Sequence, residues 1–101
     1  MRYRFTVKFK KDAQKLPEVY QCSLDKVITS IENAGNIKDI QCKKIVGTRH
    51  SYRIRMGTYR IMFIVKILVD NTVIFQRVLP RSEVYNKEYI QQLLREEKRQ
   101  K

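Results

Sequence analysis

The stretch between Asp39 and Asp70 is the part of this sequence best suited to chemistry, because it carries many cations and no carboxylate. Its basic residues are Lys43, Lys44, Arg49, Arg53, Arg55, Arg60 and Lys66. A guanidinium group is a planar fork of N–H donors that matches the oxygens of a phosphate. Such a run is either a solvated outer surface or a face that binds a polyphosphate, and the spacing of the arginines favours the second.

That spacing becomes informative if Gly57–Thr58 forms the two-residue turn of a β-hairpin. Arg55 then faces Arg60, and the alternation of a strand puts Arg53 on the same side. The opposite, core-facing side carries Tyr52, Ile54, Met56, Tyr59, Ile61 and Phe63. Two arginines directly across an antiparallel pair repel each other. We therefore expect an anion to bind on the arginine face.

The acidic residues narrow the class of reaction. They are scattered among the expected helices and turns, and no pair of them suggests a Mg²⁺ site. His50 lacks an obvious catalytic or metal-binding mate, while Cys22 and Cys42 form no CxxC pair and are expected to be reduced structural thiols. RNA can be cut without metal or cofactor, since its 2′-OH attacks the adjacent phosphate when the two are held in line. The residues therefore suit metal-independent cleavage of RNA and not metal-assisted hydrolysis of DNA.

Composition points to the same partner. The chain has 101 residues, 43% of them hydrophobic, which is the size and make-up of one globular domain over 1–101. Its formal charge is +12, and this draws polyanions such as nucleic acid. The longest apolar run, Ile61–Val69, is broken by Lys66 and is far shorter than a membrane span. Since the first residues hold no signal-peptide core, we expect a cytoplasmic protein with no membrane partner.

Periodicity supplies the elements that must hold the arginines. Alternating apolar residues predict a strand over Arg2–Phe9, a short helix follows over Lys10–Leu16, and a second helix starts at Pro17 and stops at Gly35–Asn36. Further strands are expected at Tyr52–Met56, Tyr59–Ile67 and Thr72–Leu79, with a turn at Asp70–Asn71, then a helix after Tyr85 and a frayed polar tail over 95–101. The prediction is an α+β fold: an antiparallel sheet of about four strands, two N-terminal helices packed on one face, and a short C-terminal helix.

Two segments resemble a known family. Tyr52–Ile61 (YRIRMGTYRI) looks like the central hairpin of RelE-type toxins, and Val78–Tyr85 (VLPRSEVY) is similar to the segment that follows the last strand in that family. The separation of the two motifs and the order of elements also fit, and the resemblance covers roughly residues 1–90. The chain therefore resembles the RelE/ParE toxin superfamily, in its RelE-type mRNA interferase branch.

The resemblance implies the toxin of a type II toxin–antitoxin system, an endoribonuclease that cuts mRNA on the ribosome, is monomeric when free and is silenced by an acidic antitoxin. Carried over by position, Arg53 and Arg55 match two basic residues, one of which helps to activate the 2′-OH. Arg60 matches the phosphate-stabilising arginine, Arg81 is the candidate that assists the leaving oxygen, and Tyr85 matches the tyrosine that stacks on or orients a base. As further RNA-binding candidates we take Lys43, Lys44, Arg49 and Arg77.

The chain departs from the RelE pattern at three places. Arginines stand at 53 and 55 where RelE has lysines, and an arginine cannot lose a proton to act as a base. Leu79 stands where RelE has another arginine, and Pro80 replaces a histidine found in many relatives. Two alternatives therefore stay open: a ParE-like gyrase-inhibiting toxin, and a relative that binds RNA or antitoxin without cutting.

Overall fold

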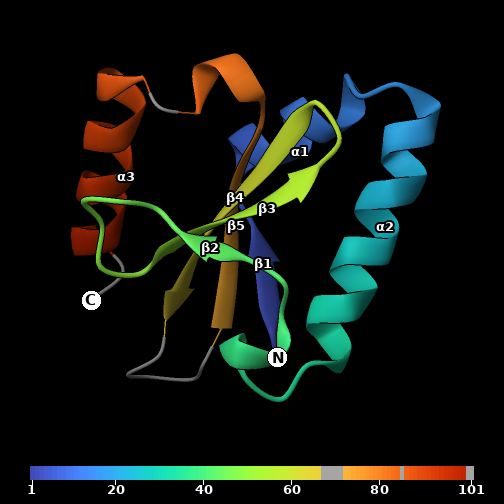
Figure 1. Ribbon diagram of the computed structural model, residues 1–101, viewed down its shortest axis with the longest axis horizontal. Coiled ribbons are helices and arrows are strands. Elements are labelled where there is room, and N and C mark those ends of the chain that lie inside the picture. The colour runs from blue at the N-terminus through green and yellow to red at the C-terminus, as the bar shows by residue number, and fades with distance from the viewer. Residues whose placement is uncertain (67–71, 85, 100–101) are drawn as a thin grey trace.

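One mixed β-sheet forms the centre of the molecule, with helices on both of its faces (Figure 1). The computed structural model describes residues 1–66, 72–84 and 86–99. In chain order the elements are β1 (Tyr3–Phe5), α1 (Val7–Gln14), α2 (Glu18–Asn33), β2 (Lys43–Lys44), β3 (Ser51–Met56), β4 (Tyr59–Lys66), β5 (Thr72–Pro80) and α3 (Lys87–Arg99), with short 3₁₀ helices at Ile37–Asp39 and Arg81–Glu83. The expected α+β fold is confirmed, and the turn expected at Asp70–Asn71 lies outside the described residues.

The sheet differs in detail from the expectation. Its strands lie in the order β1-β5-β4-β3-β2, which gives five strands among the described residues. Four of them form antiparallel pairs, but β1 runs parallel to β5 and pairs Tyr3 with Val73. Parallel neighbours require a long connection, and here α1, α2 and three strands lie between them. A short strand such as β2, with two residues, carries too little periodic signal to be predicted.

The strand expected over Arg2–Phe9 is wrong beyond Phe5. Thr6 has extended φ and ψ of −78° and 162°, and its hydroxyl accepts a hydrogen bond from the Phe9 amide at 3.0 Å, so it caps α1. The alternation of apolar residues there also places Phe5 and Phe9 four residues apart, and their rings stack with centroids 5.2 Å apart. Val7, one of the alternating apolar residues of the expected strand, is 69% exposed.

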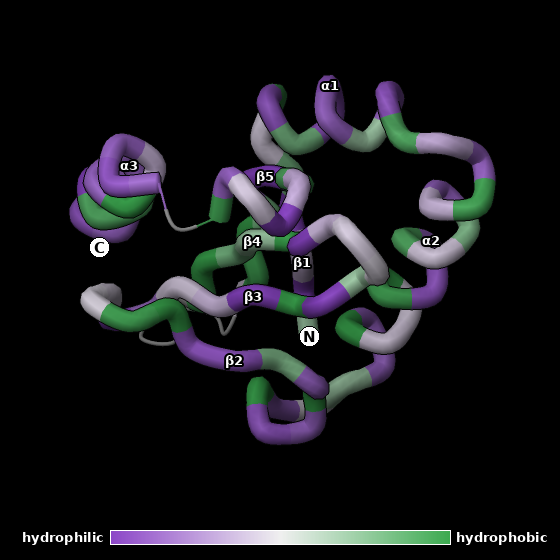
Figure 2. Tube along the Cα trace, turned by 45° about the horizontal axis from the view of Figure 1, so that its top comes forward, coloured by the Kyte–Doolittle hydropathy of each residue, from purple (hydrophilic) through white to green (hydrophobic). Residues whose placement is uncertain are grey.

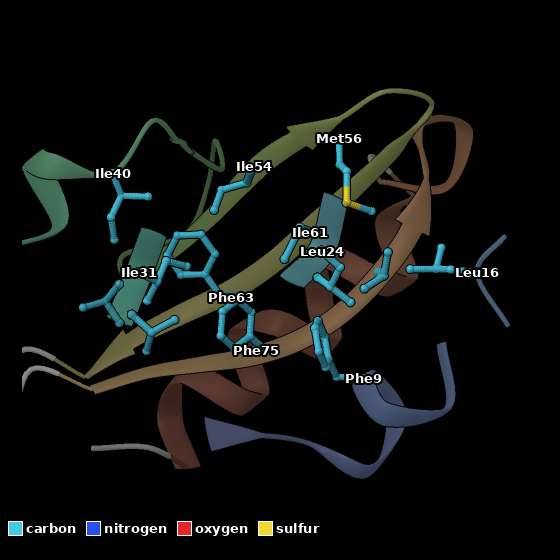
Figure 3. Close-up of a cluster of buried hydrophobic side chains, with 13 residues drawn as sticks. Phe9, Leu16, Leu24, Ile31, Ile40, Ile54, Met56, Ile61, Phe63 and Phe75 are labelled. Atoms are coloured by element: carbon cyan, nitrogen blue, oxygen red, sulfur yellow. The ribbon is translucent and has the colours of Figure 1, made fainter. Parts of the chain in front are cut away.

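The first hydrophobic core lies between the sheet and the two N-terminal helices (Figure 3). The helices contribute Phe9, Leu24 and Ile31, and the strands contribute Ile54, Met56, Ile61, Phe63, Val65, Val73, Phe75 and Val78. Because β4 alternates regularly, Ile61 and Phe63 point into this core while Met62 and Ile64 point away from it. The two N-terminal helices therefore cover one face of the sheet, as the sequence predicted.

The second core lies on the other face, under α3. It consists of Ile45, Met62, Ile64, Leu79, Val84, Tyr89 and Leu93. Residues 95–99 of the polar tail expected over 95–101 continue α3, while 100–101 lie outside the described residues. The helix continues because Glu97, one turn after Leu93, is itself buried.

Glu97 fastens the end of α3 to the loop before β3. Its carboxylate accepts hydrogen bonds from the backbone amides of Arg49, at 3.2 Å, and His50, and from the hydroxyl of the fully buried Ser51, at 2.9 Å. A buried carboxylate is costly unless it is well bonded, and these three donors supply that bonding. The sequence offered one signal: the four-residue spacing of Tyr89, Leu93 and Glu97 on a single helix face.

Replacing Glu97 with alanine should lower the free energy of unfolding by about 2–3 kcal/mol, because the buried Ser51 hydroxyl and the partly buried amides of Arg49 and His50 lose their acceptor. Urea denaturation measures the change. Glu88→Ala is the matched control on the same helix, since Glu88 is exposed and its loss should cost only a few tenths of a kcal/mol. A Glu97→Ala protein as stable as the Glu88→Ala protein would contradict the prediction.

Candidate functional site

The β3–β4 hairpin places its three arginines together, as predicted. Gly57 has a φ of +61°, which suits a two-residue turn, and the strand register pairs Arg55 with Arg60. Arg53 pairs with Met62, a residue of the α3-facing side, so all three arginines share that side of the sheet. Hydrophilic and hydrophobic residues alternate along β3 in Figure 2, which is the pattern behind this arrangement.

A groove of about 920 Å³ runs along β3 where that strand extends past β2, which pairs only with Tyr52 and Arg53. Its described lining comes from four segments: Lys26, Val27 and Ser30 of α2; Ile40, Gln41, Cys42 and Lys43; Arg53, Ile54, Arg55, Gly57 and Arg60 of the hairpin; and Arg81 and Val84. These residues include six cations and no carboxylate. Such a surface concentrates positive potential and attracts a polyanion.

Arg60 is the most constrained cation of the groove. Its side chain is 5% exposed, and its Nη1 donates to the carbonyl oxygens of Gly57, at 2.7 Å, and Tyr59, at 2.9 Å. Both acceptors belong to the hairpin turn, so the turn fixes the plane of the guanidinium. Arg60 is therefore preorganised before any ligand arrives, which is the condition for strong electrostatic stabilisation.

The other cations of the groove are more accessible. Arg53 is half-buried and cross-strand from Lys43, whereas Arg55 and Arg81 are exposed. The Arg81 amide donates to the carbonyl of Thr58 at 2.9 Å, which holds the end of β5 beside the hairpin turn. This bond explains how residues far apart in sequence line the same groove.

Three of the expected RNA-binding residues are absent from the described lining of the groove. Arg77 forms a two-pronged ion pair with Asp12, with Nε–Oδ2 and Nη2–Oδ1 distances of 2.6 and 3.1 Å. Its bonds to Asp12 raise the pKa of Arg77, so its charge is already compensated. Lys44 pairs with Tyr52 and points to the α2 side, and Arg49 lies in the loop next to Glu97. Tyr85 lies outside the described residues.

Sequence reasoning missed one wall of the groove. Lys26 and Ser30 lie one helical turn apart on α2, and Gln41 follows in the segment before β2. Polar residues on the outside of an amphipathic helix are ordinarily solvated, so nothing in their spacing separated them from other surface positions.

Three further features of the described residues bear on function. No three His, Cys, Asp or Glu side chains come close enough there to hold a metal ion, and none of the described helices is both long and apolar enough to cross a membrane. Cys22 and Cys42 are free thiols in the structure, and burial raises the pKa of Cys42. A raised pKa leaves the thiol protonated and unreactive.

Comparison with known proteins identifies the family. Residues 3–85 match the family model described as the ParE toxin of the type II toxin–antitoxin system parDE. Toxin RelE3 of Methanocaldococcus jannaschii is 34% identical over 88 residues, which cover 85% of this chain and 97% of the relative.

Solved structures agree in fold. The RelB–RelE antitoxin–toxin complex from Methanococcus jannaschii superposes with a TM-score of 0.66 at 34% identity, covering 84% of this chain and 95% of that one. A mutant of E. coli toxin RelE in the free state gives a TM-score of 0.66 at 20% identity, covering 88% of this chain and 90% of that one. The chain therefore belongs to the RelE/ParE family of toxins of type II toxin–antitoxin systems.

Proposed function

We propose that this toxin is an endoribonuclease that cuts mRNA on the ribosome by metal-independent attack of the 2′-OH. The observation that carries the proposal is the groove along β3, which is lined by six cations and no carboxylate among the described residues. Single-stranded RNA offers phosphates to such a groove, and its 2′-OH supplies the nucleophile.

The roles of the arginines follow from their environments. Arg60, oriented by the turn, binds the scissile phosphate and stabilises the charge that develops on it. Arg53 and Arg55 hold the RNA backbone and favour the ionised 2′-oxygen, whose proton passes to solvent water because arginine stays protonated. As the 2′-oxygen bonds to phosphorus, the bond from phosphorus to the 5′-oxygen breaks, and the leaving oxygen takes a proton from water. Arg81 stands exposed at the rim, where it can stabilise the leaving oxygen. Tyr85, outside the described residues, is proposed to stack on a base of the RNA.

The structure gives a reason for one departure from RelE. Leu79 is 6% exposed and packs in the core under α3, next to Val84 and Leu93. An arginine at that position would place a charge in this core. Transition-state stabilisation is therefore assigned to Arg60, with which Leu79 pairs across the sheet, and to Arg81.

We also propose that a cognate antitoxin covers the groove with an acidic segment. Without its antitoxin, the toxin is proposed to be a monomer. RelE of Methanococcus jannaschii, which resembles this chain, was solved in complex with RelB. The formal charge of +12 supports fast association with an acidic partner.

The experiment that tests the reaction is cleavage of a defined mRNA on stalled ribosomes, read by primer extension. Cuts that require ribosomes, persist in EDTA-treated toxin and leave 2′,3′-cyclic phosphate ends would support the proposal. The ParE-like alternative predicts intact mRNA together with inhibited supercoiling by DNA gyrase. A binding-only relative would change neither readout.

Binding of single-stranded RNA should depend steeply on salt. For about five phosphates neutralised at once, log Kd plotted against log salt should have a slope of about 3 to 4, because each contact releases condensed counterions. A non-cleavable 2′-O-methyl oligonucleotide and fluorescence anisotropy between 50 and 300 mM salt (roughly the informative range) measure it. A flat dependence would point to a protein target instead.

A further inference from the structure

The tip of the β3–β4 hairpin is held by a residue of α2 that no family motif singles out. The hydroxyl of Tyr20 lies 3.3 Å from the Thr58 hydroxyl and 3.5 Å from the Thr58 amide. Its ring meets the Tyr59 ring edge-on, with centroids 4.8 Å apart and planes inclined at 69°. Hydrogen bonds from Thr58 lower the pKa of Tyr20. Tyr20 therefore contacts two of the residues that shape the turn.

Gly57, the third residue that shapes the turn, can approach Tyr20 closely because it has no side chain. A Cβ atom on Gly57 would lie 2.8 Å from the Tyr20 hydroxyl oxygen, which is closer than real Cβ atoms approach. Gly57 also has a φ of +61°, which glycine adopts without strain. The first turns of α2 and the hairpin tip are thus in close contact, with no room for a side chain between them.

The same turn orients Arg60. The guanidinium bonds to the carbonyls of Gly57 and Tyr59, at 2.7 and 2.9 Å, so a shift of the tip moves both acceptors together. Tyr20 touches the turn from the α2 side of the sheet and is not part of the described groove lining, whereas Arg60 lies on the α3-facing side of the sheet and lines the groove. Tyr20 can therefore act on the groove only through the turn.

We propose that Tyr20 is a positioning residue: by bonding to Thr58 and packing on Tyr59 and Gly57, it fixes the hairpin tip and so the orientation of the Arg60 guanidinium toward the scissile phosphate. This inference rests on the proposed function of the groove. It separates two roles of α2, since Lys26 and Ser30 line the groove directly while Tyr20 sets the geometry of an arginine it does not touch.

The test is a double-mutant cycle between Tyr20→Phe and Arg60→Ala, with single-turnover cleavage on programmed ribosomes as the readout. Removing the hydroxyl should lower the saturating rate about three- to tenfold, the size expected for one hydrogen bond. The toxin concentration that gives half the saturating rate should stay unchanged, because groove and charge are intact. In the Arg60→Ala background the same change should have no effect, since positioning an absent group is worth nothing.

Tyr3→Phe is the matched control, because Tyr3 lies on β1 and no hydrogen bond of its hydroxyl is found among the described contacts. It should cleave like the parent. The positioning role would be overturned if Tyr20→Phe lowered the saturating rate equally in the parent and in the Arg60→Ala background. It would also be overturned if Tyr20→Phe changed only the toxin concentration that gives half the saturating rate. If the parent toxin does not cleave mRNA at all, the proposed function itself fails, and if Arg60→Ala alone cleaves normally, the role of Arg60 fails, so these failures are distinguishable from failure of the Tyr20 proposal.

Discussion

Replacing Arg60 with alanine should lower the single-turnover rate of mRNA cleavage by about 10²–10³, equivalent to about 3–4 kcal/mol of transition-state stabilisation. The effect is large because the guanidinium is 5% exposed and already held by two backbone carbonyls, so it stabilises charge with little reorganisation. Rates at saturating toxin on programmed ribosomes measure the loss.

The same burial means that Arg60→Ala also weakens the hairpin turn. The melting temperatures of the parent and of each variant are therefore compared, and cleavage rates are measured at a temperature well below the lowest melting temperature. Arg60→Lys keeps the charge and loses the fork, so its rate should fall between the parent and Arg60→Ala. Arg4→Ala, on the exposed face of β1, removes an equal charge outside the groove and should cleave normally. If Arg60→Ala cleaves mRNA at the same rate as Arg4→Ala, the proposed catalytic role of Arg60 is contradicted.

Replacing Phe75 with alanine should lower the free energy of unfolding by about 3–5 kcal/mol. Phe75 is fully buried, and its ring lies 5.4 Å from Phe5, 5.1 Å from Phe9 and 6.2 Å from both Tyr3 and Phe63, between ring centroids. Its loss leaves a cavity where β1, α1, β4 and β5 meet. Urea unfolding followed by circular dichroism measures the change.

The control for Phe75 is Val19→Ala, because Val19 is 74% exposed on α2. That change should alter stability by no more than about 0.5 kcal/mol. A loss below 1 kcal/mol for Phe75→Ala would mean that the aromatic cluster collapses around the cavity instead of keeping its shape (typical cavity costs are about 2 kcal/mol or more).

Local patterns in the sequence were enough to predict the hairpin and its arginine face. A strict period of two, a glycine at the turn and apolar partners all act within a dozen residues of one another, so the register of Arg55 with Arg60 could be worked out. The strand over Arg2–Phe9 failed for the opposite reason. A hydroxyl that caps a helix, such as that of Thr6, outweighs an alternation that also fits helical spacing at Phe5 and Phe9.

The site was only partly predictable, because pairing across long distances decides which charges are available. Arg77 was indistinguishable in the sequence from the groove arginines. In the structure it forms an ion pair with Asp12 of α1, which is distant in sequence but adjacent in space. Lys26 and Ser30 enter the groove because α2 packs beside β3, which no local pattern encodes. Glu97 looked like part of a solvated tail until the loop at Arg49–Ser51 supplied its donors.

The parallel pairing of β1 with β5 also affects how the toxin is made. The register pairs Tyr3 of β1 with Val73 of β5. During synthesis β1 therefore cannot join the sheet until β5 has been made. Pairing across such a span is slow to form, because loop closure must precede any gain from contact. The β3–β4 hairpin, by contrast, closes locally. A nascent chain that ends before Thr72 therefore carries the arginine hairpin without the Phe75 core behind it, and synthesis itself delays the appearance of a working groove.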